Sequence, residues 1–315
     1  MSYFSRILSF LLLSLSVATF AQSQPLIESH ELLPLLEQAQ TQTIDIRAPE
    51  AYAAGHIPNA ISAPYGRWRG PANSPGQLAD TTTFQALIHE LGLDYDQHLV
   101  VYSTGEDETD FGASARVYWT LKYLGFSNIS ILNGGYKYWQ AQQEHPVSQT
   151  SNALRPSQIE LRLHPELAIF KDELLNKISQ QQGNFQLLDS RPPAFFHGQM
   201  KAPMATTPGT IAGAQNAPFQ QWFNAGDTRI RSVDEIKKLV QQQGLDQAQE
   251  TLSFCNTGHW AATNWFVLSE LAQLPNVRLY PASMAEWTQS KTALPMDNAP
   301  TRLDQITAKL QQLVK

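Results

Sequence analysis

Six short apolar runs recur along the chain, each with the length and composition of a buried β-strand. They cover Thr43–Ile46, Leu99–Tyr102, Ile129–Leu132, Phe185–Leu188, Thr251–Phe254 and Val277–Tyr280. Between them lie segments whose apolar residues have helical spacing, for example ASARVYWTLKYLGF and AATNWFVLSELAQL. Strands that alternate with helices predict an α/β fold, with a mainly parallel sheet and helices on both faces. In such sheets, ligands bind beyond the carboxyl ends of the strands.

The same order of features occurs twice. Each half has an apolar run that ends in Asp-x-Arg, then Gly-x-Ile, a second strand, a helix pattern and a closing tryptophan. The matching positions are Asp45 and Asp189, Arg47 and Arg191, Gly55 and Gly209, Ile57 and Ile211, Ser103 and Cys255, and Trp139 and Trp287. Two copies of one unit of roughly 120 residues are the simplest explanation.

The repeat sets the predicted domain boundaries. The first unit covers residues 22–147 and the second covers residues 166–298. Residues 148–165 are polar and interrupted by proline, which is typical of a linker. The last segment, residues 299–315, has apolar residues at helical spacing. This spacing favours a C-terminal helix that packs on the protein over a membrane anchor.

Residues 1–21 differ from the rest of the chain. One positive charge, Arg6, precedes the apolar run ILSFLLLSLSV, and the small residue Ala21 precedes a polar stretch. This order is typical of a secretory signal peptide that is cleaved near Ala21. The alternative is an uncleaved N-terminal anchor, which the shortness of the apolar run disfavours. No later run approaches transmembrane length, so we expect a periplasmic or secreted protein that is free of the membrane after cleavage.

Composition limits the kind of partner. The 315 residues are 42% hydrophobic and 16% charged, as expected for a globular protein with a sizeable core, and the net charge is −6. An excess of negative charge argues against nucleic acid or an anionic membrane as a bulk partner. A local basic pocket for a small molecule is still compatible with a negative net charge.

Cys255 is the single cysteine of the chain, and it directly follows the predicted strand Thr251–Phe254. The segment CNTGHWA connects that strand to a helix that is predicted to begin near Ala261. A tight turn at Gly258 can direct several backbone N–H groups inward, and with the helix dipole these stabilise a thiolate. His259 can add a positive charge or a hydrogen bond. The alternative is an ordinary buried cysteine, but a lone cysteine in an exported protein favours a reactive one.

The whole chain resembles the tandem-domain rhodanese family, the thiosulfate and 3-mercaptopyruvate sulfurtransferases. The resemblance lies in DIRAPEAYAAGHIPNA and ILNGGYKYW in the first half, and in DSR, GTIAGAQNAPF and Cys255 in the second. It implies two rhodanese-like α/β domains, with the Cys255 loop facing the cleft between them. Ser103 stands where a reactive cysteine would be, so the resemblance implies a non-catalytic first domain.

The activity implied by the resemblance is sulfur transfer by a ping-pong mechanism. Cys255 would take the outer sulfur of a small donor as a persulfide, and a thiol or cyanide acceptor would remove it. The persulfide itself carries the group, so neither a metal nor an organic cofactor is implied, and we expect a monomer. The predicted site comprises Cys255, Asn256, Thr257, Gly258, His259, Trp260, Ala261 and Arg191, with Asp189 as structural support.

Several positions depart from the family pattern. Thiosulfate-type enzymes have two basic residues after the cysteine, whereas this chain has Asn256 and Thr257, which is nearer to the mercaptopyruvate type. His259 and Trp260 stand where both types usually have Val-Thr, and Phe195 replaces a common arginine. These departures predict poor use of thiosulfate, a doubly charged donor.

The sequence leaves the roles of five side chains open. Arg191 either binds the donor or only pairs with Asp189. Arg67 and Arg69 are expected near the cleft, with solvation as the default and donor binding as the alternative. His197 is expected to compensate partly for the arginine missing at position 195. Trp260 either lines the pocket or packs at the start of the helix.

Two other classes of protein have related features. Cysteine phosphatases need an arginine six residues after the cysteine to hold phosphate, and that position is Ala261, which argues against them. A non-enzymatic carrier would hold a persulfide or an anion and deliver it to a partner. Multiple turnover with a small donor and acceptor separates an enzyme from such a carrier.

Overall fold

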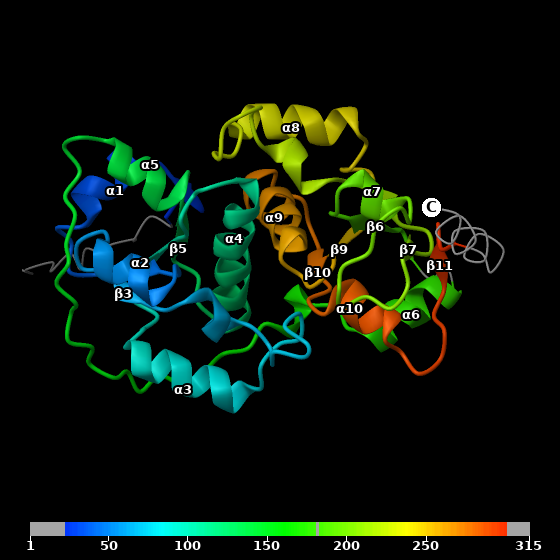
Figure 1. Ribbon diagram of the computed structural model, residues 1–315, viewed down its shortest axis with the longest axis horizontal. Helices are drawn as coiled ribbons and strands as arrows, with labels where there is room; N and C mark the ends of the chain where they lie inside the picture. Colours follow the sequence, from blue (N-terminus) through cyan, green and yellow to red (C-terminus); the bar gives the residue numbers. More distant parts are fainter. Residues whose placement is uncertain (1–22, 181–182, 301–315) are drawn as a thin grey trace, which may run out of the picture.

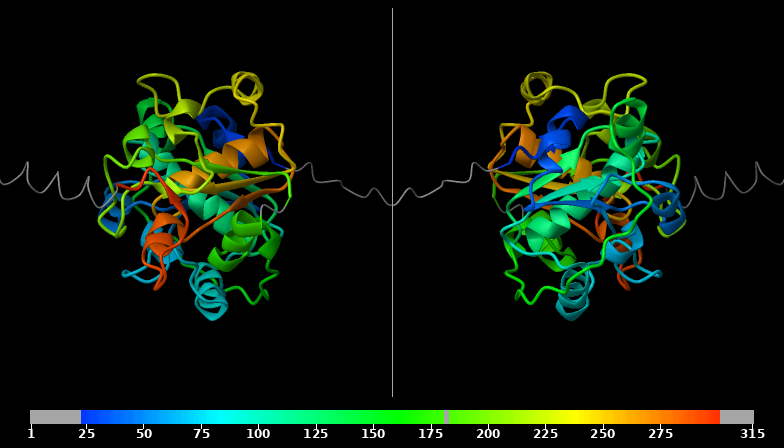
Figure 2. Two further views of the ribbon diagram at one scale, coloured as in Figure 1. Left: turned by 90° about the vertical axis from the view of Figure 1, so that its right-hand side faces the viewer. Right: turned by 90° about the vertical axis from the view of Figure 1, so that its left-hand side faces the viewer.

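The computed structural model describes residues 23–180 and 183–300 (Figure 1). The predicted signal peptide, and residues 301–315 of the predicted C-terminal helix, lie outside the described residues. The described residues form two parallel sheets, one in each half of the molecule along its long axis (Figure 1), and a small two-stranded sheet. Views along that axis show the strands in the middle, with helices above and below them (Figure 2).

A five-stranded parallel sheet forms the first domain, in the order β1-β5-β4-β2-β3. Its strands are β1 (Leu26–Ile27), β2 (Thr41–Asp45), β3 (Ile61–Ser62), β4 (His98–Tyr102) and β5 (Ile129–Leu132). Its helices are α1 (Ser29–Leu35), α2 (Pro49–Ala54), α3 (Thr81–Leu91), α4 (Glu108–Tyr123) and α5 (Gly135–Ala141), with a 3₁₀ turn η1 (Tyr65–Trp68). The three predicted strands are confirmed. The two-residue strands β1 and β3 are too short to show a period, so the sequence did not predict them.

The second domain repeats this arrangement with a four-stranded parallel sheet, in the order β10-β9-β6-β8. Its strands are β6 (Phe185–Asp189), β8 (Gln215–Asn216), β9 (Glu250–Phe254) and β10 (Val277–Leu279), and β7 (Thr210–Ile211) pairs antiparallel with β11 (Met296–Asp297). Its helices are α6 (Lys171–Gln180), α7 (Pro193–Phe196), α8 (Val233–Gln242), α9 (Trp260–Phe266) and α10 (Ser283–Thr288). Shorter turns are η2 (Pro165–Leu167), η3 (Phe219–Trp222) and the π-helical η4 (Val267–Leu271). The predicted fold class, two α/β domains with parallel sheets, is therefore confirmed.

Residues 148–165, the predicted linker, run along the outside of the first domain before η2 begins (Figure 1). Backbone hydrogen bonds attach them to that domain at His56, His89 and Tyr123. The connection is therefore long but held to the surface. It crosses to the second domain only at its end.

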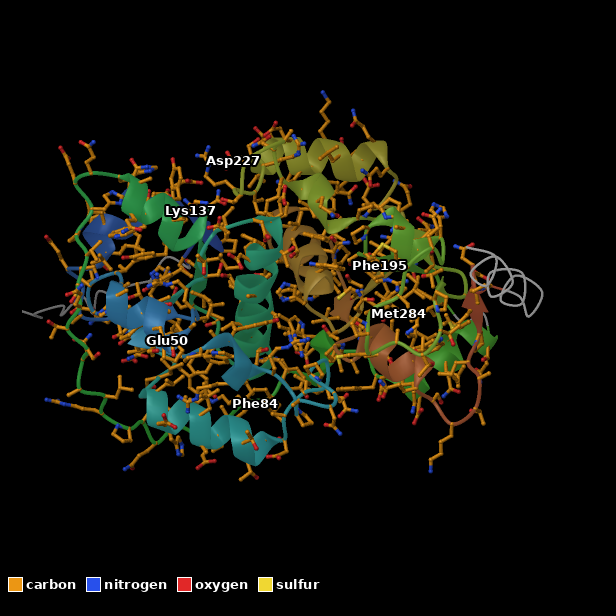
Figure 3. All side chains as sticks on the ribbon, viewed as in Figure 1. Glu50, Phe84, Lys137, Phe195, Asp227 and Met284 are labelled. Carbon is orange, nitrogen blue, oxygen red and sulfur yellow. The ribbon has the colours of Figure 1, made fainter. Side chains whose placement is uncertain are left out.

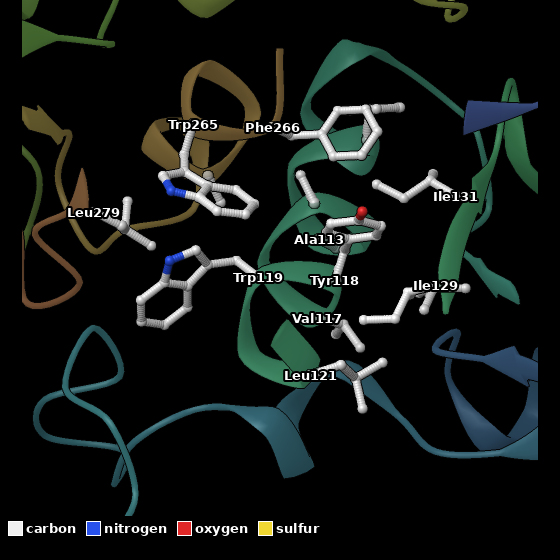
Figure 4. Close-up of a cluster of buried hydrophobic side chains, with 14 of the residues drawn as sticks. Ala113, Val117, Tyr118, Trp119, Leu121, Ile129, Ile131, Trp265, Phe266 and Leu279 are labelled. Carbon is white, nitrogen blue, oxygen red and sulfur yellow. The ribbon is translucent and has the colours of Figure 1, made fainter. Parts of the chain in front are cut away.

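Helices α4 and α9 join the two domains through one shared core. Every residue of α4 from Phe111 to Leu121 is buried, as expected for a helix enclosed on all sides. The Tyr118 ring meets the Phe266 ring of α9 at 5.0 Å, and Trp265 lies beside them (Figure 4). Because α4 is enclosed between its own sheet and α9, its residues also reach the loop that precedes α9.

Candidate active site

Cys255 lies at the carboxyl end of β9, in the middle of the second sheet, and is only 1% exposed. Its N–H donates to the Ser283 hydroxyl at 3.1 Å, and its carbonyl accepts from the N–H of Met284 at 3.1 Å. Figure 3 labels Met284, and it also labels Phe195 of α7, which belongs to the same domain. The backbone of Cys255 is thus fixed by the start of α10, a contact that the sequence did not reveal.

The loop after Cys255 has the form that the sequence predicted. Gly258 has a φ of 69°, a left-handed conformation that glycine adopts without strain. A Cβ atom at this position would collide with the Arg116 guanidinium and with the Pro281 carbonyl. Within the described chain, no acceptor is bonded to the backbone N–H groups of residues 256–259. Such a run of unpaired N–H groups is suited to binding an anion.

The carbonyl groups of this loop point at the first domain. Arg69 donates from Nη2 to the Thr257 carbonyl at 2.7 Å, and Arg116 of α4 donates from Nη1 to the Gly258 carbonyl at 3.1 Å. Arg67, two residues before Arg69, instead pairs with Glu90 at the surface. The solvated role expected for Arg69 is therefore wrong, because its guanidinium is held at the domain interface, whereas Arg67 is outside the site.

His259 is hydrogen-bonded through both ring nitrogens to the first domain. Nδ1 lies 2.9 Å from the Tyr65 hydroxyl, and Nε2 lies 2.8 Å from the Thr109 carbonyl. A carbonyl can only accept, so Nε2 carries the hydrogen and Nδ1 accepts from Tyr65. Burial, with a further contribution from Arg69, lowers the pKa of His259 to about 4.

His259 is therefore neutral at physiological pH. Of the two roles considered from the sequence, it makes hydrogen bonds and adds no positive charge. Gly112 of α4 makes room for the ring, since a Cβ there would lie 2.9 Å from Nε2.

Trp260 packs at the start of α9. Its ring stacks on Phe219 with centroids 5.0 Å apart and planes inclined by 8°, and the Phe195 ring lies edge-on to it with centroids 6.0 Å apart. Ala261 is buried, and its carbonyl accepts from Ser253. His197 is exposed at the end of α7 and contacts Phe196, so it does not replace the arginine absent at Phe195.

Arg191 and Asp189 form a buried ion pair at the end of β6. Nε and Nη2 of Arg191 both donate to the carboxylate, at distances down to 2.6 Å, and Nη2 also donates to the Gly209 carbonyl. Arg47 holds Asp45 and the Gly55 carbonyl in the same way in the first domain. The contact of Arg191 with the loop is a long one, 3.4 Å from Nη1 to the Asn256 side-chain oxygen. The geometry therefore supports the structural role for Arg191.

Arg116, Tyr65 and Ser283 are the site residues that the sequence analysis missed. One signal was available for Arg116, a single charge within the apolar helical segment ASARVYWTL. No comparable sequence signal exists for Tyr65 and Ser283, because the residues that they contact are distant in the sequence.

None of the helices in residues 23–180 and 183–300 is long and apolar enough to cross a membrane. The His, Cys, Asp and Glu side chains in the same ranges form no group that could hold a metal ion.

Comparisons with known proteins agree with this geometry. The rhodanese-like domain profile matches residues 28–142 and 171–290. The chain is 32% identical over 247 residues to "Putative thiosulfate sulfurtransferase" of Mycolicibacterium smegmatis, across 75% of this chain and 84% of the relative. It is 27% identical over 245 residues to 3-mercaptopyruvate sulfurtransferase of Escherichia coli, across 77% and 84%.

Solved structures share the fold. The crystal structure of SseA from Escherichia coli superposes with a TM-score of 0.69 at 24% identity, over 84% of this chain and 100% of that chain. The Tum1 protein of Saccharomyces cerevisiae superposes with a TM-score of 0.73 at 21% identity, over 88% and 99%.

Proposed function

This chain belongs to the rhodanese family, and on that premise we propose that it is a sulfurtransferase in which Cys255 carries the sulfur as a persulfide. One observation carries the proposal. The single cysteine stands at the carboxyl end of a central parallel strand, followed by four backbone N–H groups that have no acceptor among the described residues. A sulfur anion at Cys255 is the species that such an arrangement stabilises.

The reaction proceeds in two transfers. With thiosulfate as donor, the Cys255 thiolate attacks the outer sulfur, a new S–S bond forms, and sulfite leaves with the electron pair of the broken S–S bond. The enzyme is left as an anionic persulfide. Cyanide or a thiolate then attacks the outer sulfur, and the Cys255 thiolate departs with the electron pair. No external oxidant or reductant takes part in either transfer.

The donor that fits best is a small molecule with a single negative charge beside its sulfur. His259 is neutral, and Arg191 is bonded to Asp189. The loop itself therefore presents no cation to a doubly charged donor. A hydrogen bond to a charged group contributes ~1.5–3 kcal/mol, so two missing contacts weaken thiosulfate binding by roughly two orders of magnitude or more. A carboxylate donor of the 3-mercaptopyruvate type is less affected.

Export is the second part of the proposal. The apolar run in residues 1–21, with Arg6 before it and Ala21 after it, supports cleavage and release to the periplasm or outside the cell. N-terminal sequencing of the protein from its native cell should begin near Gln22. An intact N-terminus in the cytosol would contradict export without touching the proposed chemistry.

Intact-mass measurement tests the persulfide. After incubation with 3-mercaptopyruvate or thiosulfate and removal of excess donor, the wild type should gain one sulfur, about 32 Da, that cyanide or a thiol removes. Cys255→Ser should gain none. Equal sulfur uptake by this variant overturns the proposal.

The same preparation distinguishes the enzyme from a non-enzymatic carrier. An enzyme forms many equivalents of product per chain with small donor and acceptor together. A carrier stops after one equivalent. Stoichiometric loading alone would favour the carrier.

A further inference from the structure

Arg116 is a buried cation without a carboxylate partner. Its side chain is fully enclosed, and Nη1 and Nη2 donate to the carbonyls of Gly258 and Gly76, each at 3.1 Å. Its Nε atom has no hydrogen-bond partner. The ion pairs formed among the described residues include neither Arg116 nor Arg69.

A buried charge of this kind needs a compensating negative charge nearby, because burial removes the water that would otherwise stabilise it. Burial and the neighbouring charge of Arg69 lower the pKa of Arg116 to about 9, while Tyr65 and Cys255 act in the opposite direction. Arg116 therefore stays protonated at neutral pH. The groups that bear on its charge are Arg69, Tyr65 and Cys255, and of these the cysteine is the one that is an anion in the proposed reaction.

The same arginines set the orientation of the loop. In a trans peptide the C=O and N–H groups point in opposite directions. Because Arg69 binds the Thr257 carbonyl, the N–H of Gly258 points away from the guanidinium. Arg116 has the same effect on the N–H of His259 through the Gly258 carbonyl. Both N–H groups are thereby left unpaired in the loop that follows Cys255.

We propose that Arg116, together with Arg69, is a positioning residue by which the non-catalytic first domain completes the active site of the second. Arg116 supplies the positive charge that balances an anionic sulfur on Cys255, and both arginines hold the loop carbonyls so that the N–H groups stay available. The inference rests on the proposed function, since the anion is the thiolate or persulfide of that reaction. It also gives a role to the first domain, whose own strand end carries Ser103 instead of cysteine.

The charge can be tested without any sulfur transfer. The chain has one cysteine, so labelling cysteine with ¹³C at Cβ gives one assigned signal, whose shift reports thiol and thiolate in a pH titration. Arg116→Gln should move the midpoint upward by about one pH unit, the lower end of the effect of a nearby charge. Arg116→Lys, which keeps the charge, should restore most of the midpoint. The other titratable groups facing the loop, Tyr65, His259 and Asp107, are present in both variants.

A matched control is available in the same segment. Arg67 pairs with Glu90 at the surface, so Arg67→Gln should leave the midpoint unchanged. Arg69→Gln should move it upward by less than Arg116→Gln, because Arg69 is partly exposed. If Arg116→Gln does not fold, the titration midpoint of Arg69→Gln tests the proposal instead. An unchanged midpoint in the variant that is tested would overturn the proposal. It would show that the arginines only hold the two domains together.

Sulfur uptake separates this inference from the proposed function. In the wild type, uptake of one sulfur tests the function alone. In Arg116→Gln, the rate of uptake at pH 7 should fall about tenfold, in proportion to the smaller thiolate fraction, and should recover as the pH is raised. A wild type that takes up no sulfur would refute the function, and the titration would still test the role of Arg116.

Discussion

The hydroxyl of Tyr65 in the first domain lies 2.9 Å from Nδ1 of His259 in the second, four residues after the cysteine. The other ring nitrogen, Nε2, lies 2.8 Å from the Thr109 carbonyl, so both hydrogen-bond partners of the ring belong to the first domain. The same hydroxyl accepts a hydrogen bond from Arg69 at 3.0 Å. One side chain thus links the histidine and an arginine that binds the loop.

Tyr65→Phe should destabilise the protein by ~1–3 kcal/mol, because it leaves Nδ1 of His259 without its donor. Sulfur uptake by Cys255 should slow as well, since Arg69 loses a contact that positions it. Urea unfolding and a sulfur-loading time course measure the two effects. Tyr138→Phe is the control. It removes a hydrogen bond to Arg229 across the domains but away from the loop, so it should leave the loading rate unchanged.

Stability should fall in mild acid because of His259. Burial lowers its pKa from the ordinary 6.5 to about 4 in the folded protein, so folding favours the neutral ring. The contribution is complete above pH 6.5 and is lost as the pH falls from 6.5 towards 4, with a slope of at most about 1.4 kcal/mol per pH unit.

Denaturant unfolding between pH 7 and 4.5 measures this slope. His259→Gln should have a smaller slope than the wild type, whereas substitution of the exposed His197 by Gln should not change it. The neutral ring also predicts that thiosulfate turnover shows no loss centred near pH 6.5. Such a loss, absent in His259→Gln, would mean that the histidine is charged after all.

Arg191→Lys should reduce stability about as much as Arg47→Lys, by ~1.5–3 kcal/mol. In each variant the lysine cannot form the bidentate hydrogen bond that the arginine makes with its aspartate. If Arg191 is structural, the KM for the donor should rise by less than about threefold. A lost donor contact of ~1.4 kcal/mol would raise it about tenfold. Steady-state kinetics beside thermal unfolding distinguish these outcomes.

Gly258→Ala should abolish most sulfur uptake. A left-handed alanine alone costs ~1–3 kcal/mol, and here the Cβ also meets the Arg116 guanidinium and the Pro281 carbonyl. Gly226→Ala isolates the backbone effect, because Gly226 has a similar φ of 75° with open space around it. Equal loading by both variants would show that the close approach at Gly258 has no effect on the reaction.

Local patterns predicted the frame of the site. Cys255 at a strand end, the tight turn at Gly258 and the paired Asp-x-Arg motifs depend on residues close together in the sequence, and each was found where it was expected. The parallel sheets follow from the alternation of strand and helix patterns. The prediction also extended to the two-fold repeat, because matching patterns come from matching local structure.

Only the tertiary structure decided the charges around the cysteine. His259 is followed by an ordinary helix start, and nothing near it in the sequence shows that Tyr65 and Thr109 enclose its ring. In the sequence, Arg116 is only a single charged residue within an apolar helical segment. The residue it contacts, Gly258, lies 142 positions later in the sequence. A protonation state depends on burial and on the nearest charges. At this site the nearest charges belong to the other domain, and the packing of α4 against α9 brings them to the loop.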